Sequence, residues 1–148
     1  MKISVLGAGG WGTTLGILLH YNGHQVTLWE YKKNYVKELI KKRVNSLYLP
    51  GVNIPQEILI THDLKESVRQ KNLIVLAVPS QFLRSVIEDV SYSDIKNSIL
   101  VSVAKGIENK HLMTMSQMLK DVHPNLSEEQ IGVLSGPSHA EEVSKRIP

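Results

Sequence analysis

Short apolar runs alternate with amphipathic segments along almost the whole chain. The apolar runs predict strands at 3–6, 25–29, 58–60, 72–78, 98–103 and 131–135. The segments between them repeat apolar residues at helical spacing and predict helices at 10–21, 32–43, 63–70, 80–90 and 111–122, with a last helix beginning in GPSHAEEVSK. The stretch VNSLYLPGVNIPQE holds two prolines and a glycine, so we expect irregular structure there.

This alternation of strands and helices predicts an α/β fold. Each helix must carry the chain back to the same end of the sheet, so consecutive strands pair in parallel. Right-handed crossovers then produce an open, doubly wound parallel sheet, the Rossmann dinucleotide-binding arrangement, with strand order 3-2-1-4-5-6. We expect residues 1–148 to form this single domain.

Composition supports a packed core and narrows the classes of partner. Hydrophobic residues make up 42% of the chain and charged residues 21%. The net charge is only +3, and the lysines are not interleaved with aromatic residues, so no nucleic-acid partner is expected. Cysteine is absent and the histidines lack metal-ligand spacing, so no metal site is expected. Without a signal-like or membrane-spanning segment, a cytoplasmic location and no membrane contact are expected.

The stretch GAGGWG places Gly7, Gly9 and Gly12 in the pattern G-x-G-x-x-G, between a predicted strand and a predicted helix. In that context Gly7 allows a tight turn and Gly9 lets a pyrophosphate approach the backbone. Gly12 lets the helix pack close to the strand. The alternative is a purely structural glycine turn. Trp11 lies at the mouth of the helix, and we expect it to form a wall of a cofactor or substrate pocket.

The end of the second predicted strand, LWEYKKN, carries conflicting signals about the cofactor. Glu30 is spaced to accept hydrogen bonds from both hydroxyls of an adenosine ribose, which favours NAD. Lys32 and Lys33 follow immediately and could attract the 2′-phosphate of NADP. We favour NAD, because a carboxylate repels that phosphate whereas flexible lysines can move away, and NADP stays open.

Five motifs occur in order along the chain: GAGGWGTTLG, NSLYLPG, AVPS, AKGIE and SGPSHAEEV. Together they resemble the N-terminal cofactor domain of bacterial NAD(P)-dependent glycerol-3-phosphate dehydrogenase. The resemblance implies a homodimeric parent enzyme that acts on a small phosphate substrate. It also implies a second, helical domain, absent from this chain, that supplies the proton-transfer lysine and most contacts to the substrate phosphate.

The resemblance also assigns roles to individual residues. The cofactor contacts that it implies are Gly10, Trp11, Tyr31, Lys32, Tyr48, Pro79, Lys105 and, beside the nicotinamide, Ala140. Substrate contacts are implied for Lys105, Gly136 and Ser138. The family often has His or Arg where Tyr31 and Lys32 stand, which leaves cofactor preference open.

Pro79, Lys105 and Gly136 each follow a predicted strand, so we expect them on one rim of the sheet, where ligands of open α/β folds bind. There the Lys105 ammonium would stabilise charge that develops on a substrate carbonyl oxygen. The alternatives are a plain surface lysine and, for Gly136 to Ser138, an ordinary strand-to-helix turn capped by Ser138.

These observations predict a nicotinamide-dependent oxidoreductase. The resemblance implies that it interconverts dihydroxyacetone phosphate and sn-glycerol 3-phosphate for phospholipid synthesis. Apart from electrostatic support by Lys105, no catalytic residue is expected within residues 1–148, so this chain alone should bind cofactor with little or no turnover. Two alternatives are a non-catalytic dinucleotide-binding redox sensor and a dehydrogenase of another hydroxy acid.

Overall fold

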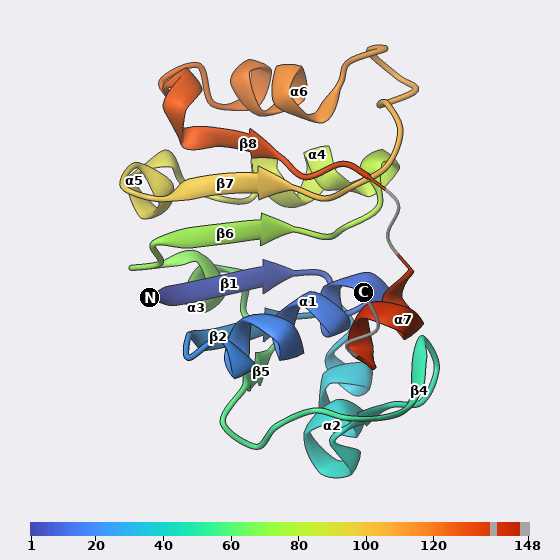
Figure 1. The fold of residues 1–148 in the computed structure, drawn as a ribbon. Coiled ribbons are helices and arrows are strands. Elements are labelled where there is room, and N and C mark those ends of the chain that lie inside the picture. Colours follow the sequence, from blue (N-terminus) through green and yellow to red (C-terminus); the bar gives the residue numbers. More distant parts are fainter. Residues whose placement is uncertain (137–138, 146–148) are drawn as a thin grey trace.

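A computed structural model describes residues 1–136 and 139–145 and contains one six-stranded parallel sheet (Figure 1). The strand order is β5-β2-β1-β6-β7-β8, and β3 and β4 form a separate pair. Counted along the chain within the six-stranded sheet, this order is 3-2-1-4-5-6, which confirms the predicted topology. The sheet strands are β1 (Lys2–Leu6), β2 (Gln25–Trp29), β5 (Leu59–Thr61), β6 (Leu73–Leu76), β7 (Ile99–Ser102) and β8 (Ile131–Val133). The helices are α1 (Gly10–Tyr21), α2 (Lys33–Lys42), α3 (Leu64–Val68), α4 (Ser80–Glu88), α5 (Tyr92–Ile95), α6 (Met115–Val122) and α7 (Ala140–Ser144), with a 3-10 turn at Glu128–Gln130.

Helices cover both faces of the sheet, so the central strands are apolar on both sides. In β1, Ile3 and Val5 pack with α1 and α2, whereas Leu6 points to the opposite core with α3, α4, α5 and α6. The apolar strands and the apolar faces of the helices therefore bury one another on both sides of the sheet. All six strands end on the same edge of the sheet, which lies on the right in Figure 1.

The main departure from expectation is the stretch predicted to be irregular. It contains β3 (Val44–Asn45) and β4 (Leu49–Asn53), an antiparallel pair beside the carboxyl edge of the sheet. The predicted helix at 111–122 begins only at Met115, because Thr114 and Gln117 form a capping box that starts the helix there. The strands predicted at 72–78 and 131–135 end early, at Leu76 and Val133.

Local capping interactions mark the ends of two helices. The Asp63 carboxylate accepts a hydrogen bond from the Glu66 backbone N–H at 2.9 Å and starts α3. Gly23 follows α1 with a φ of 83°, a left-handed conformation that glycine adopts without strain. Within the described residues no helix is long and apolar enough to cross a membrane.

Candidate functional site

The glycine loop connects β1 to α1 at the carboxyl edge of the sheet. A methyl group at Gly12 would lie 1.9 Å from the Gly7 carbonyl oxygen, so only glycine lets α1 start this close to β1. A methyl at Gly9 would meet nothing within 4 Å, so that side of the loop is open to a ligand. The first helical hydrogen bond runs from the Thr13 N–H to the Gly9 carbonyl at 2.9 Å, which leaves the N–H groups before it for an anion.

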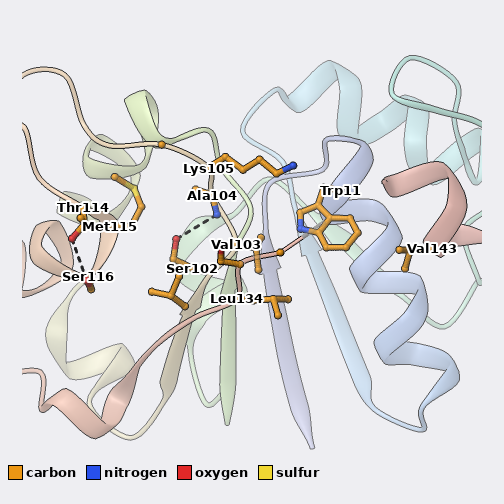
Figure 2. A pocket seen from close by; sticks show the side chains of 14 residues that line it. Trp11, Ser102, Val103, Ala104, Lys105, Thr114, Met115, Ser116, Leu134 and Val143 are labelled. Carbon is orange, nitrogen blue, oxygen red and sulfur yellow. Dashed lines mark hydrogen bonds between the residues drawn. The ribbon is translucent and has the colours of Figure 1, made fainter. Parts of the chain in front are cut away.

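A pocket of about 710 Å³ lies beside this loop, beyond the ends of β7 and β8 (Figure 2). It brings together three residues that the sequence placed at the site: Trp11, Lys105 and Gly136. In Figure 2 the Lys105 side chain extends across the pocket toward the side that carries Trp11. The other lining residues, to which the sequence assigned no individual role in binding, are Ser102, Val103, Ala104, Gly106, Thr114, Met115, Ser116, Val133, Leu134, Ser135 and Val143.

Lys105 stands on a loop that is anchored to α4 by a buried ion pair. The Arg84 guanidinium donates to both Glu108 carboxylate oxygens, at 2.6 and 3.0 Å, and His111 Nδ1 lies 3.0 Å from the same carboxylate. Arg84 also donates to Asp121 at 2.7 Å. The Arg84 guanidinium holds the pKa of Glu108 below its usual range, with a smaller contribution from His111, although burial opposes the shift.

Gln81 lies one helical turn before Arg84, and its side-chain amide binds the backbone of the same loop. The Gln81 amide donates to the Ile107 carbonyl at 2.7 Å and accepts from the Asn109 N–H at 3.0 Å. The loop after β7 has no regular secondary structure, and these bonds from α4 hold residues 107–109, directly after Lys105 and Gly106.

The end of β2 lies on the other side of the glycine loop. Glu30 is buried there, and one of its carboxylate oxygens accepts a hydrogen bond from the Lys32 backbone N–H at 3.1 Å. The Lys32 ammonium lies 5.3 Å from the centroid of the exposed Tyr31 ring, a cation–π arrangement, and interaction with Tyr31 raises the pKa of Lys32. A buried carboxylate and an exposed ammonium therefore lie near each other at the end of β2.

The remaining predicted residues are distributed around the same edge. Tyr48 lies in the β3–β4 turn, and Pro79 is the N-cap of α4. Ala140 packs on α1, where its carbonyl accepts a hydrogen bond from the Thr14 hydroxyl at 3.1 Å, and it does not line the pocket of Figure 2. Ser138 lies outside the described residues. No group of three or more His, Asp or Glu side chains in the described ranges could hold a metal ion.

Comparison with known proteins identifies the family. A family model described as the N-terminus of NAD-dependent glycerol-3-phosphate dehydrogenase matches residues 2–148. The whole chain is 47% identical to glycerol-3-phosphate dehydrogenase (NAD(P)+) of Fusobacterium nucleatum and 50% identical to that of a Thermoanaerobacter species, and it covers 44% and 43% of those proteins.

A solved structure agrees with this assignment. The crystal structure of glycerol-3-phosphate dehydrogenase from Coxiella burnetii superimposes with a TM-score of 0.90 at 31% identity, over 99% of this chain and 44% of that one. The chain thus spans less than half the length of the relatives that it matches. It belongs to the family of N-terminal domains of NAD-dependent glycerol-3-phosphate dehydrogenase.

Proposed function

We propose that this chain is the cofactor-binding part of an enzyme that interconverts dihydroxyacetone phosphate and sn-glycerol 3-phosphate. The observation that carries this proposal is the pocket in which Trp11 of the glycine loop meets Lys105 and Gly136 at the ends of two other strands. The relatives named above carry the same activity in their names. Reduction of the ketone consumes one hydride and one proton, and oxidation of the alcohol releases them.

The nicotinamide cofactor would supply or accept the hydride when bound. The glycine loop fits its pyrophosphate, because the Gly9 side is open and the first N–H groups of α1 are available there. Lys105, held by the loop that α4 anchors, would place an ammonium near the substrate carbonyl oxygen, where negative charge develops. Gly136 and Ser138 would contact the substrate, and Tyr48, Pro79 and Ala140 would complete the cofactor cleft.

NAD is the favoured cofactor in this proposal. The Glu30 carboxylate is buried and held by the Lys32 backbone N–H, so its position is fixed, whereas the Lys32 side chain is exposed and lies against the exposed Tyr31 ring. A 2′-phosphate at that position would face a fixed negative charge. Calorimetric titration with NADH and NADPH tests this preference, and equal affinity for the two would contradict it.

An assay of the full-length protein tests the activity. With NADH and dihydroxyacetone phosphate we expect consumption of NADH and formation of sn-glycerol 3-phosphate. Turnover of a different hydroxy acid from a substrate panel, without activity on this pair, would instead indicate a related dehydrogenase. Cofactor binding with no turnover of any substrate would indicate the redox-sensing module. Residues 1–148 alone should bind NADH but turn over little or not at all.

A further inference from the structure

Asn45 is a fully buried polar residue between the glycine loop and the β3–β4 turn. Its amide nitrogen donates to the Ala8 carbonyl at 2.8 Å and to the Thr13 hydroxyl at 2.7 Å. Its carbonyl oxygen accepts from the Tyr35 hydroxyl at 2.5 Å and from the Tyr48 N–H at 3.0 Å. An asparagine side chain can make four such bonds, so every donor and acceptor of Asn45 is used.

The bond to Ala8 bears directly on the loop. In a trans peptide the carbonyl and the following N–H point in opposite directions. Because the Ala8 carbonyl is directed inward to Asn45, the Gly9 N–H is directed away from Asn45. The second bond holds Thr13 in the first turn of α1. Asn45 therefore fixes the orientation of the Ala8–Gly9 peptide that leads into this helix.

The two acceptor bonds act on the opposite wall. The bond from the Tyr48 N–H holds the Tyr48 backbone, whose carbonyl oxygen lies so close to Gly10 that a methyl group there would come within 2.6 Å of it. The Tyr35 ring meets the Tyr48 ring edge-on, with centroids 6.0 Å apart. The turn that carries Tyr48 is thus fastened against the glycine loop through one side chain.

We propose that Asn45 is a positioning residue of the cofactor site: it orients the Ala8–Gly9 peptide toward the pyrophosphate and sets the distance between the glycine loop and Tyr48. Asn45 itself does not touch the cofactor, because its side chain is buried beneath the loop. The inference rests on the proposed function insofar as the ligand is a dinucleotide.

The decisive variant is Asn45→Asp in the full-length protein. A carboxylate has the same shape but cannot donate to the Ala8 carbonyl, and it places a negative charge behind an anion site. We expect the Kd for NADH to rise about tenfold or more, since a loop hydrogen bond and its geometry are lost. Tyr35→Phe is the matched control. It removes the hydrogen bond that the Asn45 carbonyl oxygen accepts from the Tyr35 hydroxyl and leaves the bonds from the Asn45 amide to Ala8 and Thr13. The Kd for NADH should therefore change less than about twofold.

A milder pair of variants covers the case in which Asn45→Asp does not fold. Thr13→Val removes the hydroxyl that accepts from Asn45, and Thr13→Ser keeps it. We expect weaker NADH binding in the valine variant and recovery in the serine variant, measured by calorimetry below the unfolding temperature of each protein.

Two results would overturn the proposal. One is an unchanged Kd in a folded Asn45→Asp or, where that variant does not fold, in Thr13→Val. The other is a loss of affinity in Tyr35→Phe as large as that in a folded Asn45→Asp, because bonds to the loop would then have no special effect. Failure of the proposed function has a separate signature: the unsubstituted protein would bind neither NADH nor NADPH.

Discussion

Two glycines of the same loop should respond in opposite ways to the same added methyl group. Gly9 caps α1 with φ −70° and ψ −177°, a conformation that alanine also adopts, and a methyl there meets nothing within 4 Å. Gly12 has a carbonyl oxygen 1.9 Å from the position of such a methyl, and the Ala77 Cβ 3.1 Å away. Gly9→Ala therefore tests the ligand site, and Gly12→Ala tests the packing of helix on strand.

The magnitudes follow from these contacts. For Gly9→Ala the lower entropy of the unfolded chain and the weaker N-cap oppose each other, so stability should change by less than about 1 kcal/mol. If the methyl displaces the pyrophosphate from one charge-assisted hydrogen bond, about 1.5–3 kcal/mol of binding free energy is lost, which raises the Kd roughly 10- to 150-fold. For Gly12→Ala the overpacking costs about 1–3 kcal/mol of stability or more.

Thermal unfolding and calorimetric titration with NADH separate the two effects. The Tm should fall about 2–4 °C for each kcal/mol lost in Gly12→Ala and stay nearly constant in Gly9→Ala. A folded Gly9→Ala protein that binds NADH as tightly as the unsubstituted one would refute the placement of the pyrophosphate. A Gly12→Ala protein of unchanged stability would refute the packing argument.

Three further predictions concern the charged groups of the site. Replacing the cation with Lys105→Met should lower kcat about 10²- to 10³-fold in the full-length enzyme, and a loss below about threefold in steady-state assays would contradict its electrostatic role. Lys32→Ala should weaken NADPH binding more than NADH binding in calorimetric titrations if Lys32 meets a 2′-phosphate, and an equal effect on both would exclude that contact. The pKa of Glu108 is lower in the folded state than in the unfolded state, so its pairing with Arg84 stabilises the protein above about pH 4.3, the usual Glu pKa, and this stabilisation is lost as pH falls further. Urea unfolding should therefore show the stability difference between the unsubstituted protein and Glu108→Gln shrinking below that pH, and a constant difference would argue against the ion pair.

Most of the sheet was predictable because its signals are local. Each strand is a short apolar run and each long helix repeats apolar residues at its own period, so element type and order could be assigned without knowledge of contacts. The β3–β4 pair was missed, since its register depends on partners across a turn rather than on alternation within either strand. The start of α6 was misplaced because the capping box at Thr114 ends the preceding loop later than the apolar pattern indicated.

The candidate site also contains residues that could be predicted from the sequence and residues that only the structure shows. Motif spacing between a predicted strand and a predicted helix selected Gly7, Gly9 and Gly12. The need for glycine is local at Gly7, which has a φ of 110°, and at Gly12, which packs on the Gly7 carbonyl. Lys105 could be placed on the rim because it directly follows a strand. The structure adds that its loop is held by α4 through Gln81 and Arg84, which lie outside the five motifs.

What local sequence determined, then, is the doubly wound sheet and the glycine loop at its edge, since residues close in the chain specify both. Only the folded chain decided how that edge is assembled. Asn45 bonds to residues 37 and 32 positions away, and Arg84 to one 24 positions away. Such partners are brought together only by the tertiary structure. A buried amide or ion pair is favourable only where each partner is in place, and that is a property of the packed structure.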